Sequence, residues 1–267
     1  MDESKNFALV TSASSGIGLA ISRELAARGY PLVIVSNEEK ITEAAGIIEK
    51  EFKVKAIPYC LDLAQSDSAE VLYNYCEENG IKVDVLVNNA GIFFFRDVVN
   101  TRAERIGTMI KLHALTPSLL SRFFAEQMIR DKRSGYILNM ASIAAWMMMP
   151  GITMYSATKS YLRCFSRAMR NEVFKKGVSI TTVCPGAVAT GLYGLASRYM
   201  KIGIKLGIIL TPERLARLAV KKMLKKKAEY IPGGILNRLF ILIIMALPER
   251  LVRRIKRRID SAINKGL

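Results

Sequence analysis

Two patterns of apolar and polar residues follow one another several times along the chain. Short, mostly apolar runs, typical of buried strands, occur at 7–12, 32–36, 55–60, 83–89, 135–142 and 178–184. Between them lie patterns typical of amphipathic helices, near 16–29, 39–51, 67–79, 103–131 and 154–176. Strands and helices alternating at this spacing predict βαβ units. We therefore expect an α/β fold with a parallel, doubly wound sheet of about seven strands and helices on both faces.

The chain is predicted to form one domain. Its 267 residues contain no internal repeat and no low-complexity linker, and 51% of them are apolar, enough to bury a substantial core. Four scattered cysteines (Cys60, Cys76, Cys164 and Cys184) form no CxxC pair. We expect buried free thiols in a reducing compartment. Because His113 is the only histidine, no metal site is expected.

Positive charge is concentrated near the C-terminus. The whole chain has 40 basic and 23 acidic residues, and residues 212–267 alone hold 15 basic against 4 acidic. The apolar run ILNRLFILIIMALPERL lies in this segment, but Arg238 and Pro248 interrupt it. It is shorter than the roughly 20 residues of a spanning helix. An apolar segment flanked by basic clusters predicts an anchor on an anionic membrane surface. A helix packed across the sheet or against a second subunit is the alternative.

The sequence also bears on nucleic-acid binding and on the location of the protein. Basic runs also suit nucleic acid, but no recognition motif or interleaved aromatic pattern accompanies them, so no nucleic acid is expected. The N-terminal MDESKNFALV is acidic and its apolar run is short, which argues against a secretory signal. We therefore expect a cytoplasmic protein, peripheral at the inner face of a membrane.

A glycine-rich stretch, TSASSGIG, follows the first predicted strand and opens the first predicted helix. Gly16 and Gly18 would let the helix start approach a pyrophosphate and pack on the sheet, and its free N–H groups suit phosphate. Ser14 and Ser15 add hydroxyl donors. Ser12 stands where a glycine is expected in the tight turn. If position 12 needs a positive φ, serine there costs about 1 kcal/mol or more.

Five elements occur in a fixed order: TSASSGIG, NNAG at 88–91, Ser142, YSATK at 155–159 and PGAVAT at 185–190. Together they resemble the short-chain dehydrogenase/reductase family over residues 5 to about 190. The resemblance implies a Rossmann-like fold and an NAD(P)-dependent oxidoreductase. On this reading residues 1–232 form the cofactor-binding and catalytic domain, with a lid at 191–210. Residues 233–267 form an apolar–basic helical tail.

The resemblance also implies a set of cofactor-binding residues. The pyrophosphate and adenosine side comprises Ser12, Ser14, Ser15, Gly16, Ile17, Gly18, Ser36, Asn37, Asp62, Leu63, Asn89, Ala90 and Gly91. The nicotinamide side comprises Tyr155, Lys159, Pro185, Gly186, Val188 and Thr190. Taken alone, Asp62 is better explained as a strand-end turn residue and Thr190 as a helix cap.

The choice between NADP(H) and NAD(H) normally depends on the end of the second strand, where an acid binds the ribose 2′-hydroxyl and repels a 2′-phosphate. Ser36 and Asn37 occupy this place, so neither the acid nor the usual arginine is present. The missing acid and the nearby Lys40 favour NADP(H), with NAD(H) as the alternative.

Tyr155 and Lys159 are four residues apart on a predicted helix and so share a face. Tyrosine with a pKa near 10 is a poor acid–base at neutral pH unless a nearby cation favours its phenolate, which Lys159 can supply. Ser142 would hydrogen-bond the substrate oxygen. His113 replaces the family's usual asparagine, whose main-chain carbonyl serves a proton relay. Pro117 has no N–H to bond the His113 carbonyl, which is predicted to be free; alternatively His113 is only packed.

The segment GLYGLASRYMKIGIKLGIIL, at 191–210, is apolar and glycine-rich, and Met147, Met148 and Met149 are expected to line the same cleft. These features favour a lipophilic carbonyl or alcohol, of the sterol, long-chain 3-oxoacyl or sphingoid type. The alternative is a catalytically silent binding or regulatory protein, which Ser12 and His113 alone support. As in other family members, a homodimer or homotetramer through the helices at 103–131 and 154–176 is expected.

Overall fold

The computed structural model describes residues 5–190, 204 and 209–264 of the chain. Its centre is a sheet of seven parallel strands in the order β3-β2-β1-β4-β5-β6-β7. The strands are β1 Phe7–Thr11, β2 Leu32–Ser36, β3 Ala56–Cys60, β4 Val83–Asn88, β5 Gly135–Met140, β6 Val178–Val183 and β7 Glu229–Tyr230. The predicted doubly wound parallel sheet is confirmed. The short β7 lies outside the six strand ranges predicted individually.

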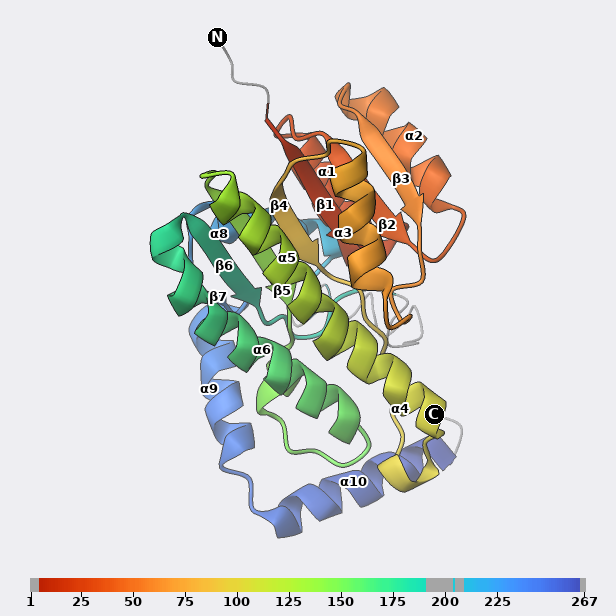
Figure 1. Ribbon diagram of the computed structural model, residues 1–267. Coiled ribbons are helices and arrows are strands. Elements are labelled where there is room, and N and C mark those ends of the chain that lie inside the picture. The colour runs from red at the N-terminus through yellow and green to blue at the C-terminus, as the bar shows by residue number, and fades with distance from the viewer. Residues whose placement is uncertain (1–4, 191–203, 205–208, 265–267) are drawn as a thin grey trace.

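Helices cover both faces of the sheet (Figure 1). The α-helices of the described residues are α1 Gly16–Ala26, α2 Ile41–Phe52, α3 Ser68–Glu78, α4 Ala103–Ile110, α5 Thr116–Arg130, α6 Thr153–Val173, α8 Pro212–Leu224, α9 Gly234–Met245 and α10 Glu249–Asn264. Neighbouring strand residues point to opposite faces. In β1, Val10 packs into the core beneath α1, α2 and α8, and Leu9 packs into the core beneath α3 and α5.

One predicted helix, 103–131, is divided in the structure. A π-helical turn, Lys111–Leu115, separates α4 from α5, and the N–H of Thr116 bonds the carbonyl of Lys111, five residues earlier. Pro117 has no N–H for the carbonyl of residue 113, so the regular pattern fails here and the turn widens. This irregularity lies beside the candidate site.

The C-terminal segment forms two helices that meet at Pro248, away from the sheet (Figure 1). Among the residues that the structure describes, no helix is long and apolar enough to cross a bilayer.

The expectation of four buried cysteines was wrong for two of them. Cys60, at the end of the edge strand β3, and Cys164, on α6, are exposed, whereas Cys76 and Cys184 are buried. Burial raises the pKa of each buried thiol to about 12. All four cysteines are free thiols, as expected.

Candidate active site

The candidate site lies at the carboxyl ends of β1 and β4, where the strand order reverses direction. In doubly wound sheets this is where ligands bind. The chain leaves β1 through residues 12–15 and leaves β4 through residues 89–91, so two predicted motifs meet here. A cleft of about 720 Å³ opens between them and extends to Tyr155, Lys159 and Thr190. Its volume suits a cofactor-sized ligand.

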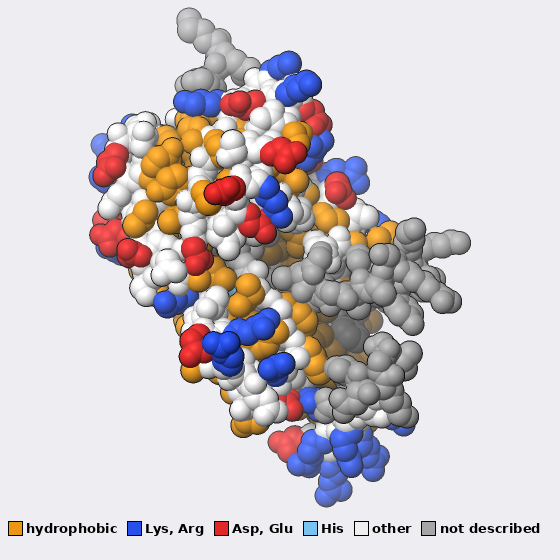
Figure 2. Space-filling view, turned by 90° about the vertical axis from the view of Figure 1, so that its right-hand side faces the viewer, with side chains coloured by type: hydrophobic (Ala, Val, Ile, Leu, Met, Phe, Trp, Pro, Cys, Tyr) orange, Lys and Arg blue, Asp and Glu red, His pale blue; other side chains and the backbone are white. Residues whose placement is uncertain are grey.

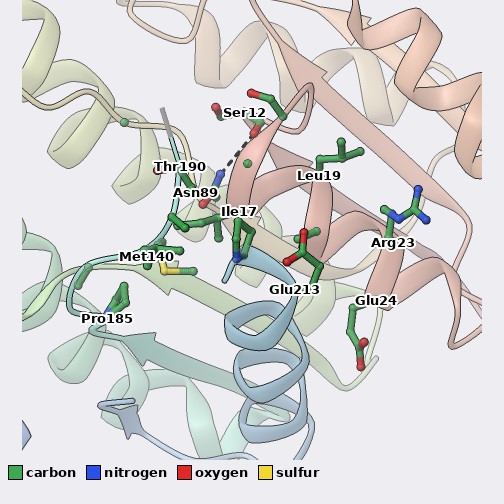
Figure 3. A pocket seen from close by; sticks show the side chains of 18 of the residues that line it. Ser12, Ile17, Leu19, Arg23, Glu24, Asn89, Met140, Pro185, Thr190 and Glu213 are labelled. Atoms are coloured by element: carbon green, nitrogen blue, oxygen red, sulfur yellow. Dashed lines mark hydrogen bonds between the residues drawn. The ribbon is translucent and has the colours of Figure 1, made fainter. Parts of the chain in front are cut away.

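The glycine-rich turn has the strained geometry that the sequence raised as a possibility. Ser12 has a φ of +53°, in the left-handed region that favours glycine, and Gly16 has a φ of +57°. A Cβ at Gly18 would overlap the carbonyl of Ser12. The side-chain amide of Asn89 donates to the carbonyl of Thr11 at 3.1 Å. It also donates to the carbonyl of Ser12 at 3.4 Å, the bond drawn in Figure 3. Asn89 thereby holds the turn in place.

Thr11, the last residue of β1, joins the two motifs and was not singled out from the sequence. Its hydroxyl donates to the carbonyl of Val87 at 3.2 Å. It accepts from the N–H of Asn89 at 2.9 Å and of Ala90 at 3.0 Å. A buried threonine that ends an apolar strand just before the glycine turn was the available signal.

The start of α1 is built to hold an anion. Its N-cap, Ser15, makes no side-chain capping bond, and no acidic residue lies in the first turn. Free N–H groups and the helix dipole therefore point at the cleft, which Ser15, Gly16 and Ile17 line. This arrangement fits the pyrophosphate of a dinucleotide.

A smaller hollow of about 100 Å³ adjoins the cleft and shares Ser12 and Gly91 with it. Predicted adenosine-side residues line it: Ser36, Asn37, Asp62, Leu63 and Ala90. The carboxylate of Asp62 accepts from the N–H of Ala64 at 2.9 Å and from the side chain of Gln65 at 3.1 Å. Asp62 thus shapes a turn and borders the hollow at once.

An acid, Glu38, lies just after the end of β2 and was not singled out from the sequence. The carboxylate of Glu38 accepts from the hydroxyl of Ser14 at 2.8 Å and lies 2.8 Å from Nζ of Lys40. The hydroxyl of Ser36 donates to that of Ser14 at 3.0 Å. The bond with Lys40, followed by that with Ser14, lowers the pKa of Glu38. The lysine that favoured NADP(H) is therefore paired with a carboxylate.

Lys159 and Tyr155 both border the cleft and are both 5% exposed. Nζ of Lys159 donates to the carbonyl of Met140 at 2.9 Å and lies 5.7 Å from the centre of the Tyr155 ring. Burial lowers the pKa of Lys159 to about 8, so the side chain still carries its charge at neutral pH. A cation fixed near the phenol ring can favour the phenolate.

Ser142 lies on the segment after β5 and is 4% exposed. Its Oγ accepts from the N–H of Ala144 at 3.1 Å and begins the 3-10 turn Ile143–Trp146, so its own proton remains to be donated. The lining of the cleft, as far as the structure describes it, includes the predicted Pro185, Val188 and Thr190. It does not include Ser142, Ser14, Gly18 or Gly186.

The profile of the short chain dehydrogenases matches residues 6–201, about three quarters of the chain. The chain belongs to this family. It is a short-chain dehydrogenase/reductase, an oxidoreductase that acts on CH–OH or C=O groups with a nicotinamide cofactor.

Two curated relatives match most of the chain. Very-long-chain 3-oxoacyl-CoA reductase-B of Danio rerio is 31% identical over 241 residues, which cover 86% of this chain and 73% of the relative. The uncharacterized oxidoreductase YmfI of Bacillus subtilis is 31% identical over 236 residues, which cover 86% of this chain and 96% of the relative.

Solved structures share the fold. A short-chain dehydrogenase from Sphingobium yanoikuyae in complex with NADPH has a TM-score of 0.78 at 24% identity, covering 89% of this chain and 92% of that one. The bulky-bulky ketone specific alcohol dehydrogenase from Comamonas testosteroni has a TM-score of 0.76 at 23% identity, covering 98% and 94%.

An apolar cluster borders the tyrosine of this short-chain dehydrogenase. Buried Met109, Ala144 and Tyr155 are packed by Ile92, Phe93, Phe94, Met147, Ile152 and Met154. The ring of Phe93 meets that of Tyr155 edge-on at 5.0 Å. The run IFFF, directly after NNAG, was not singled out from the sequence, although three consecutive phenylalanines were the signal. We call this group the apolar wall.

The expectation that Met147, Met148 and Met149 line the cleft is not confirmed, because none of them is among its described lining residues. Met147 belongs to the apolar wall, whereas Met148 is 81% exposed. The side chain of Met148 follows the 3-10 turn and faces solvent. The predicted lid, 191–210, lies outside the described residues except at residues 204, 209 and 210.

His113, the departure from the family's asparagine, borders the cleft and is 1% exposed. Its ring meets that of Tyr155 edge-on at 5.6 Å. Nε2 lies 3.0 Å from the N–H of Ile92, and Nδ1 lies 3.0 Å from the hydroxyl of Thr158. Burial, followed by the charge of Lys159, lowers the pKa of His113 well below its usual value.

Proposed function

We propose that this short-chain dehydrogenase transfers hydride between NADP(H) and a lipophilic carbonyl or secondary alcohol, of the sterol, long-chain 3-oxoacyl or sphingoid type. The observation that carries the proposal is the apolar wall against Tyr155, with Phe93 touching its ring at 5.0 Å. Such a wall favours an apolar group beside the reacting oxygen. The Danio rerio relative, named a very-long-chain 3-oxoacyl-CoA reductase, supports the same substrate class.

Three side chains are proposed to do the chemistry. The nicotinamide cofactor, when bound, supplies or accepts the hydride. Tyr155 donates its phenolic proton to the carbonyl oxygen, and the buried ammonium of Lys159 makes the resulting phenolate less costly. Ser142 donates its hydroxyl proton to the same oxygen and so fixes its position. In the oxidation direction the same groups work in reverse.

The remaining predicted residues are proposed to hold the cofactor. The helix start at Ser15, Gly16 and Ile17 takes the pyrophosphate. The smaller hollow takes the adenosine, and Pro185 to Thr190 takes the nicotinamide side. NADP(H) is favoured because Lys40 follows the end of β2, where the ribose is expected, and the Sphingobium yanoikuyae structure is a complex with NADPH. NAD(H) is the alternative, which the carboxylate of Glu38 favours.

The first experiment is thermal unfolding of the purified protein with NADPH, with NADH and with neither. A ligand at 100 times its dissociation constant stabilises the folded state by about 2.7 kcal/mol. A shift with NADPH alone is expected. A larger shift with NADH would overturn the cofactor assignment, and no shift with either would leave the proposed cofactor site without support.

Turnover is then measured on carbonyl substrates of rising chain length. We expect kcat/KM to rise with apolar length, and Tyr155→Phe to lower kcat by about 10²-fold to 10⁴-fold. The predicted alternative of a silent binding protein requires that Tyr155→Phe change nothing. Equal kcat/KM for short and long substrates would refute the lipophilic substrate class.

Assembly and location are proposed on the same basis. Ile110, Leu115, Tyr161 and Phe174 are exposed on the helices at 103–131 and 154–176, which favours a homodimer or homotetramer through them. Sedimentation at several concentrations tests this.

We retain the division at residue 233, with a cofactor-binding domain before it and a tail after it. The tail is proposed to make the protein peripheral at the inner, cytoplasmic face of a membrane.

A further inference from the structure

The solvent-facing side of α9 is apolar. Leu239, Leu242, Ile243 and Ala246 follow the spacing i, i+3, i+4, i+7, so they form one stripe, and all four are exposed. Leu242 and Ile243 are each 62% exposed. On the other side, Ile241 is 5% exposed and packs with Cys184 and Ile231. The helix is therefore held to the domain by one face and presents hydrocarbon with the other.

The outer side of α10 is basic. Arg250, Arg253, Arg254, Arg257 and Arg258 are all exposed. Figure 2 shows basic side chains gathered at the end of the molecule where Figure 1 places α10. We call the apolar stripe of α9 and these arginines the tail surface.

We propose that the tail surface docks the protein on an anionic lipid bilayer. An apolar stripe that is followed along the chain by a row of exposed arginines matches the acyl–headgroup boundary of such a bilayer, where hydrocarbon is buried and cations meet phosphates. A second copy of the chain fits less well, because a two-fold interface over this surface would bring like-charged arginines together. The proposed function includes membrane contact through residues 233–267, and this proposal assigns that contact to named side chains of α9 and α10.

The tail surface is joined to the substrate side of the site. On the inner side of α10, Nζ of Lys256 lies 3.1 Å from Oδ1 of Asp97 and 5.6 Å from the centre of the Phe95 ring. Phe95 and Asp97 belong to the same segment as Phe93, which contacts Tyr155. A docked bilayer would therefore lie next to the segment that carries the apolar wall. This consequence rests on the proposed function, since it assumes a lipophilic substrate.

The test is flotation of the full chain with vesicles of phosphatidylcholine alone and of phosphatidylcholine with phosphatidylserine. Binding only to the anionic vesicles is expected. Arg253→Gln with Arg257→Gln should weaken it about thirtyfold, at on the order of 1 kcal/mol per arginine and 1.4 kcal/mol per tenfold. Leu242→Asn with Ile243→Asn should abolish it. Lys50→Gln with Lys53→Gln removes the same charge from the far end of the molecule and should leave it unchanged.

Three results would overturn the surface. They are no flotation of the wild type with anionic vesicles, an equal loss in the Lys50/Lys53 control, and a Leu242/Ile243 variant that changes its oligomeric state but floats like the wild type. Turnover of a short, water-soluble ketone separates this proposal from the proposed function. If turnover persists while flotation fails, only the surface is refuted.

A second inference concerns His113 and rests on different contacts. The N–H of Ile92 can only donate, so Nε2 of His113 must accept, and the ring proton of the neutral side chain must be on Nδ1. Nδ1 then donates to Thr158 Oγ1, whose own proton is directed to the carbonyl of Met154 at 2.9 Å or of Tyr155 at 3.1 Å. Each donor in this series of hydrogen bonds therefore has an acceptor.

We infer that His113 is a positioning residue, a neutral clamp between the segment after β4 and the helix that carries Tyr155 and Lys159. The imidazole reaches both ends because its nitrogens lie on opposite sides of the ring. An asparagine amide can replace only Nδ1 of the ring, and a glutamine amide can replace only Nε2. Neither side chain can therefore make both contacts. The buried groups that face the ring, Tyr155 at 5.6 Å and the cationic Lys159, add no anion that would favour a protonated imidazole.

Because His113 is the only histidine, a long-range ¹H–¹⁵N spectrum of the protein reports it without assignment. Protonated Nδ1 with unprotonated Nε2 is expected at neutral pH and still at pH values below the ordinary histidine pKa. Protonated Nε2, or a midpoint at the ordinary histidine value, would overturn the clamp. Kinetically, His113→Asn and Thr158→Val should each lower kcat more than they change KM. The double variant should be no worse than the single ones. Additive losses would show that the two residues act independently.

Discussion

Ser12 adopts a left-handed conformation, φ +53°, in the glycine-rich turn after β1. For a residue with a Cβ this costs about 1–2 kcal/mol, against about 0.5–1 kcal/mol of extra chain entropy that glycine would lose on folding. The loop nonetheless keeps its shape, because Asn89 bonds the carbonyls of Thr11 and Ser12. The strain at Ser12 is therefore compensated by its neighbours.

Ser12→Gly is expected to stabilise the protein by about 0.5–1 kcal/mol, because it removes more strain than the entropy it adds. The shift in Tm should be about 2 °C for a chain of this size. Differential scanning calorimetry measures it, with Ser12→Ala as the control. A lower Tm for the glycine variant would contradict the assignment of strain.

Lys159 should make stability rise with pH on the alkaline side. Its pKa is about 8 in the folded protein and 10.5 ordinarily, so between these values the unfolded chain binds more protons than the folded one. The free energy of unfolding must then increase with pH across this window. Buried Cys76 and Cys184 act in the opposite sense, since their folded pKa values are raised.

The difference between the wild type and Lys159→Met isolates this effect, because the cysteine contributions cancel. Urea unfolding at several pH values is the measurement. We expect the free energy of unfolding of Lys159→Met to exceed that of the wild type near pH 8, and the difference to decrease toward pH 10.5. A constant difference would mean that the lysine titrates normally.

The pair Glu38 and Lys40 should set the choice of cofactor. Glu38→Gln removes the carboxylate that occupies Lys40, so the lysine can meet a 2′-phosphate and the repulsion of that phosphate falls. We expect kcat/KM for NADPH relative to NADH to rise by about tenfold, and Lys40→Gln to reduce it. No change in the ratio in either variant would place the discrimination elsewhere.

At the scale of elements, the segment 92–97 is held by four different parts of the fold. His113 binds Ile92, Tyr155 packs on Phe93, the carbonyl of Gly151 accepts from the N–H of Arg96 at 2.7 Å, and Lys256 of α10 pairs with Asp97. Each contact is local to one residue, but together they fix the segment 92–97 against α6 and α10. The tail helix α10 thus contacts the same segment that packs on Tyr155 of α6.

Asp97→Asn should loosen α10 without unfolding the domain. The Lys256–Asp97 pair is partly exposed, so its loss is worth at most about 1 kcal/mol, or about fivefold in local opening. Hydrogen exchange of the α10 amides should accelerate by that factor. Glu126→Gln, which removes the exposed pair with Arg122, is the control and should leave α10 unaffected. Unchanged exchange in α10 would refute the coupling.

At the scale of the whole molecule, charge is divided unevenly. Residues 212–267 hold 15 of the 40 basic residues, but only 4 of the 23 acidic ones. Such an imbalance acts over a Debye length, about 10 Å at 0.1 M salt and about 3 Å at 1 M. It bears on the docking of the molecule and has little influence on its fold.

Binding to anionic vesicles is therefore expected to fall at least tenfold between about 0.1 M and about 1 M salt. Turnover of a short, water-soluble ketone should stay nearly constant, since the cleft is far less screened. Co-sedimentation and a spectrophotometric assay over the same salt series compare the two. Binding that does not depend on salt would mean that the α9 stripe acts alone.

The sequence alone determined the order of the first six strands and of the helical segments between them, since each depends on local periodicity. It also placed the motifs, because the carboxyl ends of parallel strands meet at one edge, where Ser12 and Asn89 now lie. Only the tertiary structure decided the partners of side chains. The pairing of His113 with Thr158, 45 residues away, depends on the π-helical turn, and that of Lys256 with Asp97, 159 residues away, on the path of the tail. Such contacts follow from packing angles between elements, which no local pattern encodes.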